Sequence, residues 1–427
     1  MADERAIPET HEAAAACMRD APLPPAILEV AEVLHNADHD VVIVGGAVRD
    51  FLLGRDHGDW DLASSATPDE VQRLFPRTIP TGIDHGTVTI LCGRGDDRVT
   101  TEITTFRGEG SYVDGRRPTE VRFLRALKAD LARRDFTINA MAWNPLTGAF
   151  TDVFGGLEDL RAGVVRAVGV AAERFREDGL RAMRAVRLCA ALGYTLEGET
   201  ARAIAGALDT LDRVSRERVQ VELMKLLKAP KPSLGLWPMV ETSMWPHVLA
   251  DYDDAERAAA IAAVDALPGD PTLRLARLLW PLRAQPATIE AVLDGRLRPS
   301  RDERARVMRL CVPANEAFAA LREPPAIRRA AAALGREHLG DILALLAVDP
   351  AQAARVREAC DGAALTTQEL ALGGRDLINA GLLMPGPTIG ELLRGLLDWV
   401  FDDPRRNTHD ALMAEASRRL AEPSPST

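Results

Sequence analysis

The sequence predicts an α+β protein in which a mixed α/β region is followed by a larger, all-helical region. Two patterns support this fold class. Between Val41 and about Phe154, short runs rich in β-branched residues alternate with short helical stretches and are broken by Gly and Pro. After about Gly156, Ala, Leu, Arg and Glu recur at helical spacing almost to the end. The chain has 427 residues, which at roughly 150 residues per domain corresponds to two to four domains.

The mixed region holds three runs that we expect to be strands: VVIV at 41–44, TVTIL at 87–91 and VTTEITTF at 99–106. Two stretches between them, AVRDFLL and PDEVQRLF, are expected to be helices. In the second region, repeated prolines divide the pattern into short helices. Residues 1–24, which mix acidic residues, alanines and prolines, are expected to be a disordered leader outside the fold.

The composition limits the classes of partner. The chain has 52 basic and 63 acidic residues and a net charge of −11, so a local patch must hold any anionic partner. Its five cysteines stand singly, as in a protein of a reducing compartment. Apolar runs of roughly 20 residues and a secretion signal are both absent from the sequence. We therefore expect a cytoplasmic protein with no membrane partner.

A candidate phosphate site lies where the first strand ends. The strand runs into Gly45 and Gly46, and a helix is expected to begin within a residue or two. Backbone N–H groups and the positive end of the helix dipole would then face one point. Arg49, one turn into the helix, could add a guanidinium fork to the same phosphate. A Gly-Gly pair is also common in ordinary tight turns, and the segment lacks the G-x-G-x-x-G pattern of dinucleotide-binding folds.

Two carboxylates follow this glycine pair. Asp59 and Asp61 are separated by one residue, and in a strand such residues point to the same face. Side by side they would repel each other unless a cation lay between them. Hard oxygen ligands next to substrate phosphates suit Mg²⁺. A D-x-D sequence in a solvated turn is the alternative.

A third acid can be proposed on the strand predicted at 99–106. Alternation places Glu102 on one face with Thr100 and Thr104, and Ile103 on the other. Three acids around two metal ions would complete a site for phosphoryl transfer. Taken alone, Glu102 would be an ordinary solvent-facing strand residue.

A run of one acid and three arginines stands in the helical region. Asp178, Arg181, Arg184 and Arg187 are spaced by three residues along a predicted helix and so share a broad stripe. A solvated helix would show the same charges. The surplus positive charge, however, suits a triphosphate.

Five segments follow one another along the chain: GGAVRDFLLGRDHGDWDLA at 45–63, EITTFR at 102–107, RRDFTINAMAWNP at 133–145, DVFGGLEDLRAGVVRAVG at 152–169 and RFREDGLRAMRAVRLCAALGY at 174–194. In this order they closely resemble the class II tRNA nucleotidyltransferase and bacterial poly(A) polymerase family. A further stretch at 214–227, VSRERVQVELMKLL, is also similar, and the resemblance is strong over about residues 40–230 and weak beyond them.

The resemblance implies an N-terminal nucleotidyltransferase head of the polymerase-β type, followed by a helical neck, body and tail. It implies that Asp59 and Asp61 hold the metal ions and that Glu102 is the third catalytic acid. It also assigns residues to the nucleotide: Gly45, Gly46, Arg49, Arg134, Asp135, Asn139, Asp178, Arg181, Arg184 and Arg187. Within that set, Asp135 and Asn139 would brace Arg134, while Asp178 and Arg181 would read the base.

Hydrogen-bonding groups explain how such a pair could select a base. A fixed Asp accepts from the amino group of cytosine or adenine, and a fixed Arg donates to the neighbouring ring nitrogen. Uracil and guanine present the opposite pattern on that edge. A mismatch would leave buried polar groups unpaired, so one pocket could select CTP and ATP without a nucleic-acid template.

The expected domains are a leader at 1–24, a catalytic head at 25–156, a neck with the base-reading helix at 157–230, and a body and tail at 231–427 that bind RNA. The expected function is template-independent addition of CCA, from CTP and ATP, to the 3′ end of tRNA by two-metal phosphoryl transfer with Mg²⁺.

Three alternatives remain open at this point: a poly(A) polymerase, a partial enzyme that adds only A or only CC, and a non-catalytic RNA-binding relative. The chain lacks the basic tail that would give nonspecific grip on any RNA. Its mixed-charge helical half instead suits recognition of a structured RNA by shape. DNA is not an expected partner, and the oligomeric state is left open.

Overall fold

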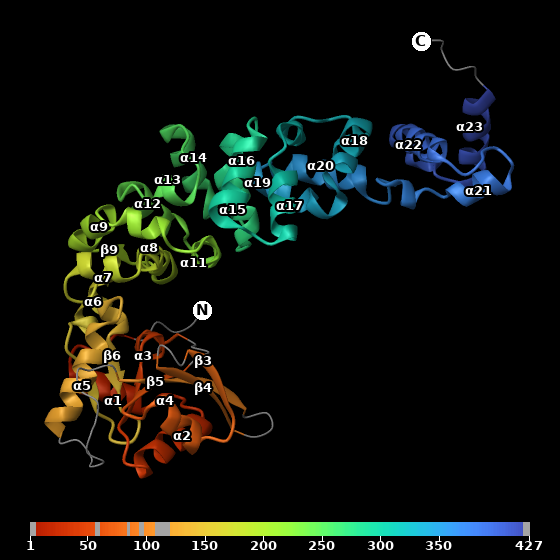
Figure 1. The fold of residues 1–427 in the computed structure, drawn as a ribbon. Helices are drawn as coiled ribbons and strands as arrows, with labels where there is room; N and C mark the ends of the chain where they lie inside the picture. The colour runs from red at the N-terminus through yellow and green to blue at the C-terminus, as the bar shows by residue number, and fades with distance from the viewer. Residues whose placement is uncertain (1–5, 56–59, 83–85, 94–97, 107–119, 422–427) are drawn as a thin grey trace. The chain divides into compact units, whose positions relative to one another are not determined.

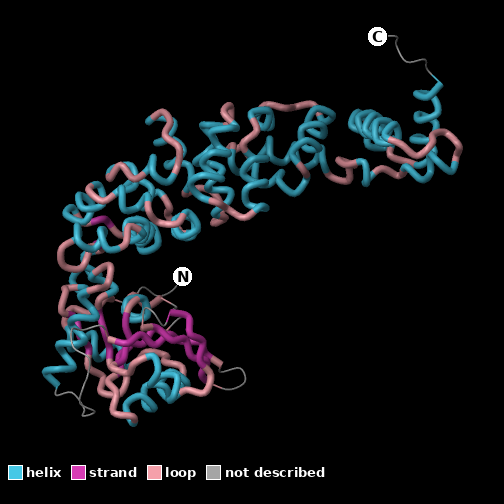
Figure 2. Tube along the Cα trace, in the orientation of Figure 1, coloured by secondary structure: helices cyan, strands magenta, loops and turns pink. Residues whose placement is uncertain are grey.

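A computed structural model describes residues 6–55, 60–82, 86–93, 98–106 and 120–421 (Figure 1). The chain divides into two compact units, Met1–His247 and Val248–Thr427. The first unit combines a sheet with helices, and the second is built from helices and loops (Figure 2). The predicted α+β class is confirmed.

The first unit is organised around a mixed sheet. Within the described residues, seven strands form it in the order β3-β4-β5-β2-β1-β6-β7. The pair β2–β5 is parallel, and the other neighbours are antiparallel. The strands are β1 (Val41–Val44), β2 (Asp61–Ser64), β3 (Thr78–Gly82), β4 (Thr87–Cys92), β5 (Val99–Thr105), β6 (Met141–Trp143) and β7 (Phe150–Asp152).

Helices cover both faces of this sheet. Helices α2 (Pro25–Asn36) and α4 (Pro68–Leu74) pack on one face (Figure 1). Helix α4 starts where the sequence indicates, because Thr67 and Glu70 form a capping box in front of it. On the other face, α5 (Glu120–Ala132) closes a core with Val42 and Val44 of β1. That core contains Val42, Val44, Ala63, Phe106, Leu127, Leu131, Ala140, Ala142 and Val168.

The prediction that residues 1–24 form a disordered leader is wrong for the described part of that segment. Residues His11–Arg19 form helix α1, which packs against β7 and against α3 (Gly46–Leu52). Its Ala14 and Met18 side chains are fully buried. The alanine-rich sequence is a good helix former, and burial of the Met18 face supplies the tertiary packing that a helix this short requires.

Helices of the neck complete the first unit. Helix α8 (Leu180–Leu192) packs against α11 (Arg216–Lys228) and α12 (Ser233–Glu241). The approach of α12 is close, since a Cβ on Gly235 would lie 2.3 Å from the carbonyl oxygen of Val186. The compact first unit ends at His247. Its other elements are η3 (Thr137–Asn139), α6 (Gly156–Ala162), β8 (Val164–Val165), α7 (Ala171–Glu177), β9 (Thr195–Leu196), α9 (Gly198–Ala205), α10 (Leu208–Asp212) and α13 (Trp245–Val248).

The second unit has its own buried core, to which Ile289, Val307, Phe318 and Ile342 belong. No helix within the described ranges has the length and apolar character that crossing a membrane requires. The helices are α14 (Asp254–Val264), α15 (Pro271–Leu279), α16 (Pro286–Val292), α17 (Arg301–Leu310), α18 (Pro324–Leu334), α19 (Leu339–Leu345), α20 (Pro350–Cys360), α21 (Gly374–Asn379), α22 (Pro387–Asp402) and α23 (His409–Ala421). Short helical turns lie at η4 (Trp280–Leu282), η5 (Leu293–Leu297), η6 (Pro313–Ala319), η7 (Arg336–His338), η8 (Thr367–Glu369) and η9 (Pro404–Arg406).

Candidate active site

The parallel pairing of β2 with β5 brings two predicted acids together. Leu62 stands opposite Ile103 in the register, so the preceding residues Asp61 and Glu102 are neighbours on the other face of the sheet. Both line a cavity of about 220 Å³. Asp59, the remaining predicted acid, lies outside the described residues. The cavity is lined by Val44, Asp61, Leu62, Thr87, Glu102, Thr104, Arg133 and Arg134.

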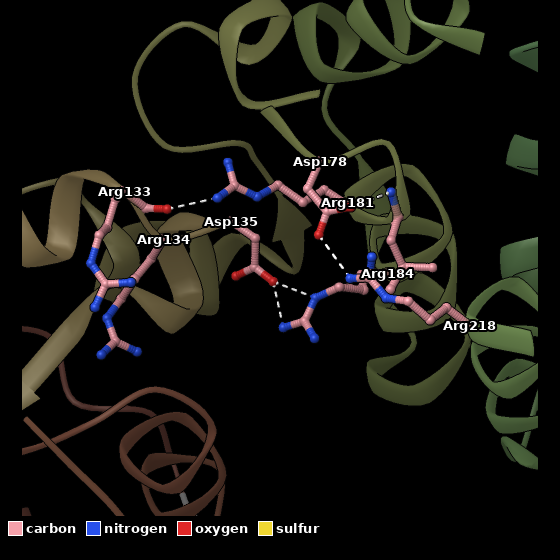
Figure 3. A pocket seen from close by; sticks show the side chains of 8 residues that line it. Arg133, Arg134, Asp135, Asp178, Arg181, Arg184 and Arg218 are labelled. Atoms are coloured by element: carbon pink, nitrogen blue, oxygen red, sulfur yellow. Dashed lines mark hydrogen bonds and ion pairs between the residues drawn. The ribbon is translucent and has the colours of Figure 1, made fainter. Parts of the chain in front are cut away.

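A second cavity, of about 250 Å³, is rich in arginine (Figure 3). It shares Arg133 and Arg134 with the first cavity, so these two arginines stand between the acids and the neck. Three of the predicted nucleotide residues from the neck reach it. Its lining consists of Arg133, Arg134, Asp135, Asp178, Leu180, Arg181, Arg184 and Arg218.

One buried carboxylate holds the two shared arginines. Asp130 has a fully buried side chain and accepts hydrogen bonds from Arg133 Nε at 2.9 Å and Arg134 Nη2 at 3.2 Å. Asp130 was not predicted from the sequence, although its spacing of three and four residues from the arginines, at the end of a helix, is a usable signal. Asp135 and Asn139 were predicted to brace Arg134. That prediction is wrong, because both side chains bind other arginines.

Gly45 is required by the backbone at the end of β1. Its φ of +78° lies in the left-handed region that favours glycine. A Cβ at this position would lie 3.2 Å from Arg134 Nη1 and 3.9 Å from Asp61 Oδ2. Bare backbone therefore lies beside both a cation and a carboxylate. Gly46 follows as the first residue of α3.

A chain of polar contacts connects α3 to the neck. The guanidinium of Arg49 binds both carboxylate oxygens of Asp50 at 2.8 Å and also donates to Asn139 Oδ1. Asn139 donates to Asp135 Oδ1 at 3.1 Å, and Arg184 reaches Asp135 Oδ2 with Nε at 2.7 Å and Nη2 at 2.6 Å (Figure 3). Arg49 thus uses its fork on protein groups.

Asp135 is ionised in spite of its burial. Desolvation opposes the charged form, but the charge of Arg184 and hydrogen bonds from Asn139, Arg184 and the Phe136 N–H outweigh it and lower the pKa of the carboxyl. The same ion pair raises the pKa of Arg184. The two groups therefore form an ion pair at neutral pH that connects Asp135 to α8.

The predicted base readers, Asp178 and Arg181, lie in the second cavity. Asp178 is not part of the helix as expected: it caps α7, and α8 begins only at Leu180. In this turn its Oδ1 accepts from the Leu180 N–H at 3.0 Å, and its Oδ2 accepts from Arg218 Nη2 at 3.0 Å. Sequence analysis did not predict Arg218, because 40 residues separate it from Asp178.

Arg181 and Arg187 differ in position. Arg181 donates from Nη2 to the Arg133 carbonyl oxygen at 2.9 Å and from Nη1 to Glu177 at 2.8 Å, which fixes its guanidinium at the cavity wall (Figure 3). Arg187 does not line either cavity among the described residues and instead pairs with the buried Glu222 of α11. The structure therefore brings Arg181 and Arg184 together but not Arg187.

The acids of the first cavity fit a divalent ion. Asp61 and Glu102 supply hard carboxylate oxygens, and such an ion commonly takes one or two carboxylates and completes its shell with water and substrate phosphates. In the part of the chain that the structure describes, no three His, Cys, Asp or Glu side chains are grouped so that they could hold a metal. The predicted ligand Asp59 falls outside that part.

Two family models match the chain. The model described as "Poly A polymerase head domain" matches residues 41–166, and that described as "Probable RNA and SrmB- binding site of polymerase A" matches residues 193–256. The first match contains both acids, Arg133 and Arg134. The second contains Arg218.

Curated relatives match over almost the whole length. A CCA-adding enzyme of Lactiplantibacillus plantarum is 37% identical over 397 residues, which cover 90% of this chain and 93% of the relative. A CCA-adding enzyme of Streptococcus pneumoniae is 37% identical over 399 residues, covering 91% and 95%. One from Levilactobacillus brevis is 46% identical over 234 residues, covering 54% and 58%.

Solved structures agree with the fold. The Bacillus stearothermophilus CCA-adding enzyme in complex with CTP has a TM-score of 0.72 at 30% identity, covering 93% of this chain and 99% of that one. The Thermotoga maritima CCA-adding enzyme complexed with tRNA has a TM-score of 0.72 at 22% identity, covering 95% and 98%, and supports the fold alone.

Proposed function

We propose that this chain, which belongs to the class II tRNA nucleotidyltransferase family, adds CCA to the 3′ end of tRNA from CTP and ATP without a template. The observation that carries this function is the junction of two cavities at Arg133 and Arg134. One cavity presents the acids Asp61 and Glu102. The other presents an Asp and an Arg suited to a base edge. Relatives that match nine-tenths of the chain are CCA-adding enzymes.

The reaction forms one phosphorus–oxygen bond and breaks another. The 3′-hydroxyl oxygen of the RNA attacks the α-phosphorus, the α–β phosphoanhydride bond breaks, and pyrophosphate leaves. Membership in a nucleotidyltransferase family implies a divalent metal ion, and we propose Mg²⁺. When bound, one such ion would lower the pKa of the attacking hydroxyl, and a second would offset charge on the leaving group. Asp61 and Glu102, together with Asp59, would hold these ions.

Charged groups around Gly45 would position the triphosphate. The bare backbone of Gly45 allows close approach, and Arg134 Nη1 lies beside it. Arg133 stands on the same cavity wall, held by Asp130. Because Asp130 fixes both guanidiniums before substrate arrives, they can donate to phosphate oxygens with little further ordering. Arg49 and Asn139 would act through Asp135 rather than by touching phosphate.

Base selection would occur in the second cavity. Asp178 has two of its lone pairs bound by the Leu180 N–H and by Arg218, and a carboxylate retains others for the amino group of cytosine or adenine. Arg181 would donate to the adjacent ring nitrogen. Arg184, paired with Asp135, would stand beside the nucleotide.

The proposed activity and the division into two units suggest roles for the remaining regions. The head is proposed to lie within residues 25–156, with helix α1 packed onto it, and the neck within 157–247, the latter extended to the end of the compact first unit. The helical unit from Val248 onward is proposed to bind the tRNA body. A cytoplasmic location follows from that substrate.

One incubation tests the function. Purified protein with Mg²⁺ is given tRNA that ends before CCA, together with each labelled nucleotide in turn and then with CTP and ATP. The expected product is extended by C, C and A and stops there. Incorporation of A alone in long runs would favour a poly(A) polymerase, and incorporation of only A or only CC a partial enzyme. If no nucleotide is incorporated, the remaining candidate is a non-catalytic RNA-binding relative.

A further inference from the structure

Two threonines stand beside the acids in the first cavity. Thr87 of β4 and Thr104 of β5 are direct partners in the antiparallel register, and both line the cavity with Asp61 and Glu102. Their Oγ1 atoms are 3.0 Å apart, so one hydroxyl donates to the other. Both residues are half-buried.

The hydrogen-bonding capacity of this pair is well defined. One hydroxyl uses its proton inside the pair, which leaves the other proton and several lone pairs for a ligand. The ligand that matches is a neutral hydroxyl, which can accept the remaining proton and donate its own. A phosphate would gain only one donor here, whereas arginines are available across the cavity at Arg133 and Arg134.

We propose that Thr87 and Thr104 bind the terminal ribose of the RNA acceptor through its 2′-hydroxyl. This inference rests on the proposed function. The 2′-hydroxyl is vicinal to the attacking 3′-hydroxyl, so a side chain that holds the first also places the second. Thr104 lies two residues from Glu102 on the same strand face, a separation of about 7 Å. That distance leaves room for a ribose between the hydroxyl pair and the acids.

The distribution of charge indicates that the side of the first cavity that holds Thr87 and Thr104 faces the RNA acceptor. The incoming nucleotide carries several negative charges, and the cations are at Arg133, Arg134 and in the second cavity. Among the described residues that line this cavity, the hydroxyl side carries no charge other than those of the acids. The nucleotide therefore approaches from the arginine side and the ribose end from the threonine side, with Asp61 and Glu102 between them.

The test combines protein variants with a single-atom change in the RNA. The variants are Thr87→Val, Thr104→Val and the double variant, in which a β-branched side chain of similar size keeps the strand but loses the hydroxyl. The control is Thr100→Val, on the same face of β5 but outside the cavity lining. Each protein adds C to an acceptor ending in ribose and to one ending in 2′-deoxyribose, and kcat/KM is measured for both.

The expected result is that the wild type and Thr100→Val prefer the ribose end by about tenfold, the loss of one hydrogen bond, and that the double variant accepts both ends within about twofold. Discrimination between CTP and dCTP should not change. Thr87→Ser and Thr104→Ser, which retain a hydroxyl, should keep the wild-type preference for the ribose end. A thermal melt checks that the valine variants fold.

Three results would overturn the inference: a wild type that does not discriminate between the ends, a double variant that still does, or a change in CTP against dCTP discrimination, which would assign the pair to the incoming nucleotide. If the wild type adds no nucleotide, the proposed function fails. In that case binding decides the inference. The Kd of the acceptor that ends in ribose and of the acceptor that ends in 2′-deoxyribose is measured for the wild-type protein and for the double variant.

Discussion

Buried carboxylates set the positions of the arginines in this site. Asp130 and Asp135 are each less than a tenth exposed, and each binds arginine. Burying a charge is costly unless it is paired, so each pair holds its partners in one arrangement. The arginines that could meet a polyphosphate are therefore ordered by the protein before the ligand arrives.

Replacing the acid that anchors two arginines should weaken nucleotide binding without altering base choice. In Asp130→Asn, Arg133 and Arg134 lose a charged partner, so KM for CTP and for ATP should rise by about tenfold. Selectivity for CTP over UTP should remain, because Asp178 and Arg181 keep their partners. Steady-state kinetics with the three nucleotides measure this.

The matched control for that variant is Asp159→Asn. Asp159 is also buried and binds an arginine, Arg166, but lines neither cavity. Equal increases in KM for the two variants would show that Asp130 contributes only to the fold.

The ion pair between head and neck should appear in the pH dependence of stability. The pKa of Asp135 is below its usual 3.8 in the folded protein, so its contribution to the free energy of unfolding is complete above that value and is lost as the pH falls through the lower folded pKa. The stabilities of wild type and Asp135→Asn in denaturant unfolding should thus differ by a constant amount above about pH 5, and the difference should begin to shrink only below about pH 4, as the pH falls toward the lowered folded pKa. A difference that does not shrink in acid would contradict the ion pair.

At the scale of elements, the parallel pairing of β2 with β5 creates the acidic corner. β2 is four residues long and β5 seven, and a slip of one residue would turn Glu102 toward the buried face. Ile103 and Val88 are buried on that face and fix the register. The positions of the two acids therefore depend on the hydrophobic packing on the opposite face of the sheet.

Removing the charge of either Asp61 or Glu102 should slow catalysis strongly and leave the fold intact. Asp61→Asn and Glu102→Gln should each lower kcat by about 10³-fold, equivalent to about 4 kcal/mol of transition-state stabilisation. Asp59→Asn should do the same. Single-turnover C addition and a thermal melt together measure this. Glu158→Gln, an exposed acid of α6, is the control, and near-normal turnover in Asp61→Asn would refute its assignment.

At the scale of the whole molecule, each unit has its own core. Residues 1–247 form one compact unit that contains both cavities, while the rest of the chain forms another. A chain with a net charge of −11 cannot attract tRNA by overall charge, so RNA binding requires local arginines.

The division predicts a functional fragment. Residues 1–247 alone should melt cooperatively and bind CTP with a Kd within about threefold of the full chain, because both cavities are complete in that fragment. Binding of tRNA should weaken by at least about tenfold. Calorimetry and filter binding measure these quantities. A fragment that loses CTP binding although it melts cooperatively would show that the second unit contributes to the nucleotide site.

The sequence alone was enough to predict that VVIV, TVTIL and VTTEITTF are strands and to predict the face on which Glu102 lies. These features depend on local periodicity and short motifs, which a linear pattern expresses directly. The same pattern misassigned residues 11–19, because burial of Met18 depends on a strand far along the chain.

Only the tertiary structure decided which polar and charged groups are partners. Arg218 meets Asp178 across 40 residues, Arg184 meets Asp135 across 49, and Thr87 meets Thr104 across a strand pair. Such contacts depend on how helices and strands pack, and many alternative pairings of acid and arginine have the same sequence pattern. The residue types near the site are thus a property of the sequence, and their arrangement into two cavities is a property of the fold.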